Sequence, residues 1–276
     1  MGIVAFGFDL YVGRKALHRR LVARAFAVNI ALPAIVFALT YALIGHQGSI
    51  AVNIALSLVI VAMIGLFLYR IAFQPIAHTS VLVLLIASVG SHFAMQGLGL
   101  LFFGAEGQRG PPLADAALTV GALRFTGQSL AVYAATIAFI VALWLFFGLT
   151  LYGKALRATA VNRLGARLAG IRTSLSGQIA FLFASVIGAL SGILIVPIAT
   201  LYYDTGFLIG LKGFIAAIIG GLASYPLTAA AALVVGIVEA FSSFYASNFK
   251  EVIVFTLLIP VLLLRSLAAP AVEEEE

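Results

Sequence analysis

Long apolar runs with few charged residues fill most of this sequence, and they decide what the chain can fold into. Most runs are close to the roughly 20 residues that an α-helix needs to cross the hydrocarbon of a bilayer. A backbone inside lipid must satisfy its own N–H and C=O groups, which favours helices. We therefore predict an all-α polytopic membrane protein with about eight transmembrane helices, some broken by proline and glycine. The predicted spans are 25–45, 49–69, 79–103, 128–152, 179–202, 206–223, 227–244 and 252–264.

Composition favours a single membrane domain. Hydrophobic residues make up 63% of the 276 residues and charged residues only 9%, whereas soluble domains carry about 25% charged residues. No polar stretch is long enough for a separate soluble domain, so we expect one domain over residues 1–276. The chain has no cysteine, which excludes disulfides, thiolate metal sites and cysteine nucleophiles. Residues 1–12 are too short to span lipid and lack the basic start of a signal peptide.

The distribution of lysine and arginine predicts which side of the membrane each segment faces. Cations are retained in the cytoplasm during insertion, and the eight-span path with both ends inside places 12 of the 16 cations there, including a cluster at 14–24. Residues 104–127 form the longest external loop on this path. Topology thus explains the net charge of +6, and we expect no nucleic-acid partner. The four cations on the outer side are Arg109, Arg124, Lys212 and Lys250, and Lys212 is expected to extend to the lipid interface.

One inner segment, residues 153–178, is long, basic and prone to form a helix. It carries five cations and no acid, and its apolar residues recur at helical spacing. Such a segment can lie flat on lipid headgroups, or it can dock into a groove on another protein. The five cations are Lys154, Arg157, Arg163, Arg167 and Arg172.

Polar residues inside the predicted spans are candidates for a translocation path. Ser88, His92 and Gln96 lie within span 79–103, and the spacing of His92 and Gln96 puts them on one helix face. A polar face at this depth lines a water-filled cavity or forms hydrogen bonds between helices, and both interpretations stay open for Gln96. His92 has no second ligand at metal-binding spacing, so we expect no metal site.

Two further polar residues stand in apolar surroundings. Asn29, near the start of the first span, is expected to form a hydrogen bond to another helix. Glu239 lies within span 227–244, and an acid inside the membrane is a candidate functional residue. The favoured alternative for Glu239 is pairing with Lys212, Lys250 or a nearby backbone donor.

The sequence contains no recognisable catalytic set. It has no Ser/His/Asp arrangement, no paired carboxylate motif and no phosphate-binding loop. We therefore predict that the chain is not an enzyme, needs no cofactor and takes part in transport. Uphill transport would need energy from another protein, because the chain has no nucleotide site of its own.

Several stretches resemble the inner-membrane permeases of branched-chain amino acid ABC importers, specifically the shorter, H-type member of the permease pair. They are FLYRIAFQPI (67–76), ASVGSHFAMQGLGLLFFG (87–104), GKALRATAVNRLGARLAGI (153–171) and GLKGFIAAIIGGLASYPLTAAAALVVGIVEAF (210–241). The resemblance implies a non-catalytic permease in the bacterial inner membrane. The implied partners are a second permease in a heterodimer, two cytoplasmic ABC ATPases, a periplasmic substrate-binding protein and membrane lipid.

The resemblance also implies a role for the basic inner segment. In this family the matching stretch holds a short cytoplasmic coupling helix that sits in a cleft on the ATPase, which favours docking over lipid binding. ATP-driven closure of the ATPases would shift this helix and rock the neighbouring spans. The residues that match its pattern are Gly153, Ala155, Leu156, Arg157, Ala158, Asn162, Ala166, Leu168, Gly170 and Ile171. The candidate residues of the translocation path are Ser88, His92, Gln96, Gly220, Gly221 and Glu239.

The resemblance implies leucine, isoleucine and valine as substrates. Relatives that carry urea, short amides or aromatic acids provide the alternative within the family. A self-sufficient channel or secondary carrier is the alternative of another class. Family members begin with one more helix, and the start of this sequence resembles the segment that comes after that helix. The first family helix is therefore expected either to be missing here or to precede a start codon that is placed late.

Overall fold

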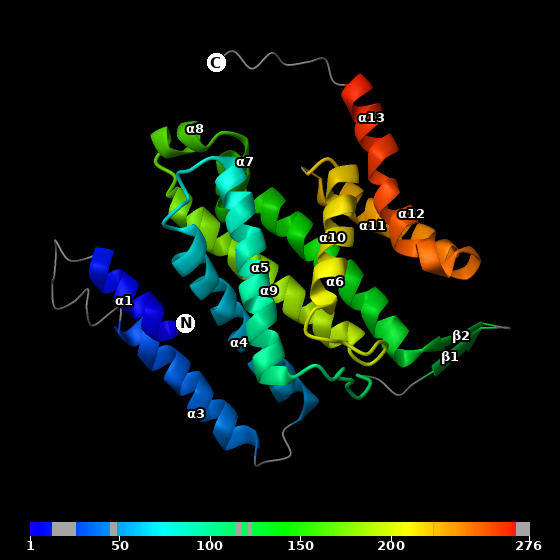
Figure 1. Ribbon diagram of the computed structural model, residues 1–276, viewed down its shortest axis with the longest axis horizontal. Coiled ribbons are helices and arrows are strands. Elements are labelled where there is room, and N and C mark those ends of the chain that lie inside the picture. The colour runs from blue at the N-terminus through cyan, green and yellow to red at the C-terminus, as the bar shows by residue number, and fades with distance from the viewer. Residues whose placement is uncertain (13–25, 45–48, 114–116, 121–122, 223, 269–276) are drawn as a thin grey trace. The chain divides into compact units, whose positions relative to one another are not determined.

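The computed structural model describes residues 1–12, 26–44, 49–113, 117–120, 123–222 and 224–268. Most of these residues are helical (Figure 1), as the apolar runs predict. The basic cluster at 14–24 lies outside the described residues.

Contacts group the chain into unit 1, Met1–Tyr133 with Leu149–Leu201, and unit 2, Ala134–Gly148 with Tyr202–Glu276. The single membrane domain over 1–276 stays a prediction.

Unit 1 contains most of the helices. Its first part consists of α1 (Gly2–Val12), the π-helical segment η2 (Ala27–Ala31), α3 (Leu32–Ile44), α4 (Ile50–Leu68), the π-helical segment η3 (Tyr69–Phe73) and α5 (Val81–Phe103). Its second part consists of a hairpin, both ends of α6 (Gly127–Leu149), α7 (Leu151–Val161), α8 (Arg163–Leu168) and α9 (Thr173–Ile195).

The expected external loop at 104–127 contains a hairpin that the sequence patterns did not predict. β1 (Ala117–Val120) pairs antiparallel with β2 (Leu123–Thr126), with Ala117 opposite Thr126. Earlier in the same loop, Gln108 and Leu201 exchange two backbone hydrogen bonds of 2.8 and 3.0 Å. The loop is therefore attached to the chain that follows α9.

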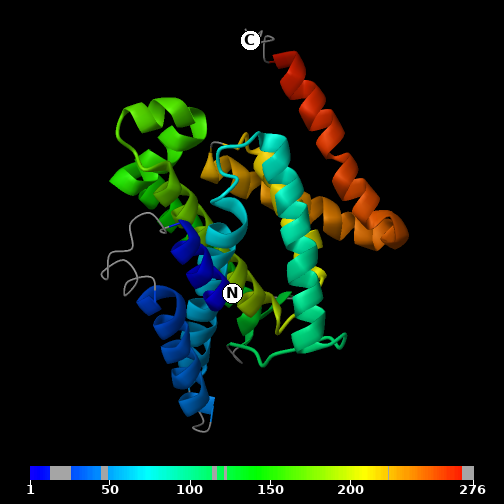
Figure 2. The ribbon, with the colours of Figure 1, turned by 60° about the vertical axis from the view of Figure 1, so that its left-hand side comes forward.

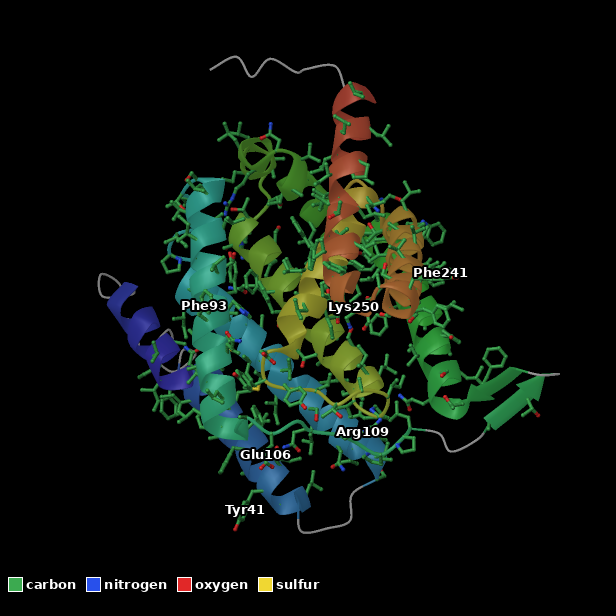
Figure 3. The ribbon with its side chains drawn as sticks, turned by 45° about the vertical axis from the view of Figure 1, so that its right-hand side comes forward. Tyr41, Phe93, Glu106, Arg109, Phe241 and Lys250 are labelled. Atoms are coloured by element: carbon green, nitrogen blue, oxygen red, sulfur yellow. The ribbon has the colours of Figure 1, made fainter. Side chains whose placement is uncertain are left out.

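Unit 2 is built around three helices that share a small apolar core. Its elements are the middle of α6, α10 (Thr205–Ile219), α11 (Tyr225–Tyr245), the 3₁₀ turn η4 (Ser247–Phe249), α12 (Lys250–Thr256) and α13 (Leu258–Ala268). Figure 3 labels Lys250 at the start of α12. The buried residues of this apolar core come from α10, α11 and α12. They are Ile215, Ala216, Ala231, Val235 and Val254.

Six of the described helices are long and apolar enough to cross a membrane. They are Ile50–Phe73, Leu82–Phe103, Gly127–Leu149, Thr173–Ile195, Tyr225–Tyr245 and Ser247–Leu264. Two of the predicted spans, 25–45 and 206–223, correspond instead to the shorter apolar helices Asn29–Leu43 and Thr205–Ile219. The polytopic all-α class is thus confirmed, whereas the count of eight is not. Phe37, Tyr41 and Phe102 are 74%, 76% and 76% exposed, as befits side chains that face lipid.

The closest helix pair of unit 1 is α4 with η3 against α9, and glycine makes this contact possible. A Cβ atom built at Gly65 would overlap the side chain of Ser185, and one built at Gly177 would overlap the ring of Tyr69. Tyr69 is 4% exposed and lies 5.2 Å from Phe181 between ring centroids. Small residues allow helices to approach this closely inside a membrane, where packing rather than water release holds them together.

We expect Gly177→Ala to weaken the contact between α9 and η3, because the added methyl group displaces a buried ring. Overpacking of this kind costs about 1–3 kcal/mol. The measurement is the thermal stability of the purified protein in detergent. Gly188→Ala in the same helix is the matched control, since no described atom lies within 4 Å of a Cβ built there. Equal stability of the two variants would show that this contact is not tightly packed.

Candidate coupling surface

The basic inner segment forms two short helices, α7 and α8, separated by one residue. Thr150 caps the start of α7, and its Oγ1 accepts a hydrogen bond of 3.0 Å from the backbone N–H of Gly153. Asn162 ends α7 through its own N–H, which donates to the carbonyl of Ala158. The Oδ1 atom of Asn162 then accepts from the N–H of Gly165 at 2.7 Å and starts α8. Asparagine suits this position because its side chain satisfies a free N–H at a helix start.

Gly170 ends α8 in a left-handed conformation with φ of +83°. The N–H of Gly170 donates to the carbonyl of Arg167, and the N–H of Ile171 donates to that of Ala166, both at 2.9 Å. These two bonds are the Schellman arrangement that closes many helices. Glycine adopts this φ without steric cost, so the sequence match at Gly170 has a local backbone reason.

Side chains attach both helices to the rest of unit 1. Thr159 Oγ1 lies 3.1 Å from Ser176 Oγ, which connects α7 to α9. Arg163 donates to the carbonyl oxygen of Ala77. Arg167 Nη2 lies 2.5 Å from His78 Nδ1, and Arg167 Nε donates to Thr173 Oγ1 at 3.3 Å. The two helices are therefore anchored at three places.

The outward surface of α7 and α8 is apolar and cationic together. Val161, Leu164 and Leu168 are 89%, 68% and 82% exposed. Lys154 and Arg157 are also exposed on α7. Exposed apolar side chains beside cations suit a partner that offers an apolar groove with acids at its edge.

The position of these helices along α9 places them at the opposite end from the 104–110 part of the predicted external loop, as the predicted path requires; the cytoplasmic side stays a prediction. Figure 2 shows α7 and α8 gathered where α9 begins. At the other end of α9, about 35 Å away for a helix of 23 residues, Arg109 donates to the carbonyl of Ile198 at 3.3 Å. Glu106 and Arg109 lie on that outer loop in Figure 3. Five cations of residues 153–178 at the start of α9 agree with the positive-inside bias.

The ten residues predicted for coupling differ in exposure. Gly153 and Ala166 are buried, so they shape the segment and cannot contact a partner directly. The half-buried members are Ala155, Leu156 and Ile171, and the exposed members are Arg157, Ala158, Asn162, Leu168 and Gly170. Val161 and Leu164 belong to the apolar residues at helical spacing but not to the ten that match the family pattern, and they are 89% and 68% exposed. The exposed side chains of Arg157, Ala158, Val161, Leu164 and Leu168 together form a surface that we term the coupling surface.

The candidate residues of the translocation path fall into two groups. Ser88, His92 and Gln96 lie on α5 in unit 1. The Oγ of Ser88 donates to the carbonyl of Leu85 at 2.7 Å, and the ring of His92 lies 5.5 Å from that of Phe93. His92 and Gln96 are half-buried. Their role in transport stays a prediction.

The other group lies in unit 2, where local structure explains the two glycines. Gly221, with φ of +84°, ends α10 by donating to Ile218, and the N–H of Leu222 donates to Ala217. A Cβ at Gly220 would overlap Thr228 at the start of α11. The pair therefore permits a tight turn between two packed helices.

Glu239 takes part in an ion cluster. Lys212 Nζ lies 2.5 Å from Glu239 Oε1 and 3.1 Å from Glu251 Oε1, and so joins α10, α11 and α12. Lys250 lies 3.9 Å from Glu251. The favoured pairing of Glu239 with Lys212 is present. The side chain of Lys212 is only 17% exposed and bonds these two carboxylates. The prediction that Lys212 extends to the lipid interface is therefore wrong. Two nearby carboxylates compete with headgroups for the same cation.

Sequence reasoning missed a polar contact at the outer end of unit 1. Gln128 is 5% exposed; its Oε1 accepts from the N–H of Leu113, and its Nε2 donates to the carbonyl of Leu194, both at 2.8 Å. A glutamine at the first turn of an apolar helix was the signal available. In the described part of the chain, no three His, Asp or Glu side chains are placed to hold a metal ion.

Comparison with known proteins gives consistent matches. The sequence matches the family described as "Branched-chain amino acid transport system / permease component" over residues 2–262. The "High-affinity branched-chain amino acid transport system permease protein LivH" of Escherichia coli (strain K12) is 30% identical over 228 residues, covering 79% of this chain and 74% of that protein. The corresponding permease protein BraD of Pseudomonas aeruginosa is 29% identical over 231 residues, covering 80% and 75%. No solved structure gives a significant match.

We expect Gly170→Val to loosen the end of α8, because a branched residue is strained at φ of +83°. The cost of about 1–2 kcal/mol for a left-handed residue corresponds to roughly 5- to 30-fold faster amide exchange at Ile171. Gly170→Asn is the matched control, since asparagine tolerates this conformation and should keep exchange near the original rate. Unchanged exchange in the valine variant would contradict a structural need for glycine.

Lys212→Met should destabilise unit 2 by about 1–3 kcal/mol, because it removes the counter-ion of Glu239 and leaves Glu251 only the more distant Lys250. Glu239→Gln should cost less, since Lys212 keeps Glu251 as a partner. The measurement is thermal unfolding in detergent, and Lys250→Met is the control because that side chain is 41% exposed. Loss of transport in Glu239→Gln at unchanged stability would instead favour a role for Glu239 in the translocation path.

Proposed function

The chain belongs to the permease family of branched-chain amino acid transport systems, as its motifs predicted, and on this premise we propose that it is the membrane-spanning permease subunit of an ABC importer. It would reside in the bacterial inner membrane and move leucine, isoleucine and valine inward. The observation that carries the proposal is the family match over residues 2–262, together with the 30% identity to LivH.

The partners follow from the division of labour in such importers. The proposed assembly contains a second permease, two cytoplasmic ABC ATPases and a periplasmic substrate-binding protein, and this chain itself hydrolyses no ATP. Six helices long enough to cross the membrane provide the transmembrane part. The energy enters from the ATPases.

The coupling surface is the proposed contact with an ATPase. Its large apolar side chains, Val161, Leu164 and Leu168, are exposed by two-thirds or more, and no acid in residues 153–178 neutralises Arg157 beside them. A cleft with apolar walls and acidic edges complements such a surface. The caps at Thr150, Asn162 and Gly170 hold the two helices in shape before docking, which reduces the entropy lost on binding.

Movement of the docked helices would open the path alternately to the two sides. α7 follows α6 after one residue, and α9 begins five residues after α8 ends. A shift of α7 and α8 therefore displaces two span-length helices directly. Rigid displacement of packed helices about a central site is a common mechanism of alternating access.

The substrate is the least constrained part of the proposal. The names of LivH and BraD state branched-chain amino acids, and the mostly apolar spans suit such side chains. Relatives that carry urea, short amides or aromatic acids leave the same architecture open to other small solutes. Competition of labelled leucine uptake by each class of solute separates these alternatives.

Reconstitution into vesicles tests the function. We expect ATP-dependent leucine uptake when this chain is combined with its second permease, ATPases and binding protein, and none from this chain alone. Uptake by this chain alone would support a channel or secondary carrier instead.

Within the complete assembly, Arg157→Glu should reduce uptake roughly tenfold or more, because it reverses a charge that would face the acidic edge of the proposed ATPase cleft. Arg157→Lys keeps the charge and is the control, and equal membrane amounts of both variants exclude an insertion defect.

A further inference from the structure

The two arginines that anchor α8 reach a turn that is distant in the sequence. This turn, residues 74–80, connects η3 to α5 and is called the 74–80 turn. Arg163 bonds to the carbonyl of Ala77, 86 positions earlier, and Arg167 contacts His78, 89 positions earlier. Figures 1 and 2 both show this turn beside α8. α8 is thus connected to a part of unit 1 that it does not adjoin in the chain.

The 74–80 turn continues directly from η3, which is packed firmly against α9. Tyr69 of η3 is 4% exposed and would collide with any side chain at position 177. Phe73 lies 4.7 Å from Phe181 between ring centroids. Closely packed contacts of this kind transmit displacement because they have no free volume to absorb it.

A polar contact leads from η3 to the first helices of unit 1. Arg70 Nη1 donates to Asn29 Oδ1 at 3.0 Å, and Asn29 is completely buried in η2. This is the hydrogen bond between helices expected for Asn29. Both residues lie in π-helical segments, a rare geometry that recurs at functional sites. η2 leads straight into α3.

We propose that Arg163 and Arg167 are positioning residues that carry the displacement of α8 through the 74–80 turn to η3, and through Arg70 and Asn29 to α3. The proposal rests on the proposed function, because it assigns the route by which ATPase movement reaches helices outside the coupling loop. α7 and α9 are pulled by their chain connections to α8. α3 and α5 have no such chain connection, whereas α4 packs directly against α9 through Gly65 and Ser185. Arg163 and Arg167 give α8 its own link to the 74–80 turn, which leads into α5.

The chemistry of the His78 contact makes the route testable. An arginine guanidinium has only donors, so the ring nitrogen of His78 facing Arg167 must accept. A side chain at position 78 that offers an acceptor keeps the contact, whereas a cation there repels both Arg167 and Arg163. His78 is exposed, so substitutions at this position leave the core unchanged.

The test compares uptake with ATP hydrolysis in vesicles that contain the complete importer and labelled leucine. The double variant Arg163→Ala/Arg167→Ala should keep ATP hydrolysis while leucine uptake per ATP falls about fivefold or more, the lower end of typical coupling between sites. Arg172→Ala is the matched control: it removes a nearby cation whose side chain makes no hydrogen bond or ion pair in the described residues. Its ratio of uptake to hydrolysis should stay unchanged.

Substitutions at position 78 keep the test decisive if the double variant assembles poorly. His78→Gln should retain the original ratio, and His78→Lys should lower it by a similar factor to the arginine variant. His78→Ala and Arg167→Ala should be non-additive when combined, because they remove one contact. A wild-type ratio in His78→Lys, or full additivity, would overturn the proposed route while ATP-driven uptake by the wild type persists. Absence of ATP-driven uptake in the wild-type assembly would instead refute the proposed function.

Discussion

Lipid removes water as a partner for the backbone, and this constraint shapes the whole chain. Each span must be a helix that satisfies its own hydrogen bonds, and adjacent helices gain little from burying apolar surface. Contact between them then depends on close approach. Gly65 and Gly177 permit that approach between α4, η3 and α9, where Ser185 and the ring of Tyr69 occupy the space a side chain would need. Many other large apolar side chains are exposed and free to face lipid.

Hydrogen bonds and ion pairs of polar side chains connect the helices at further places. At the inner end of unit 1, caps at Thr150 and Asn162 shape α7 and α8, and Arg163 and Arg167 attach α8 to the 74–80 turn. At the outer end, Gln128 joins the loop at Leu113 to the end of α9. In unit 2, one lysine between two carboxylates joins three helices. The ends of the helices are therefore specified by directional bonds, and their middles by shape.

This division suits a protein that transfers movement from one side of a membrane to the other. A surface fixed by caps and arginine contacts can be displaced as a body, since the caps keep α7 and α8 in shape and the arginines connect α8 to the 74–80 turn. Packed glycine contacts would carry the proposed displacement into the spans. The same bonds that stabilise the inner end of unit 1 thereby provide the mechanical connection on which coupling to an ATPase would depend.

The sequence by itself determined the membrane class, the positions of most spans and the family, and it predicts the inner side for the basic segment. These follow from apolar run length, charge distribution and local motifs, all of which act over neighbouring residues. Only the tertiary structure decided that Arg70 bonds to Asn29, that Arg167 meets His78 and that Lys212 bridges Glu239 and Glu251. These partners lie 27 to 89 positions apart. Such pairings depend on how the helices pack, which no local pattern of residues records.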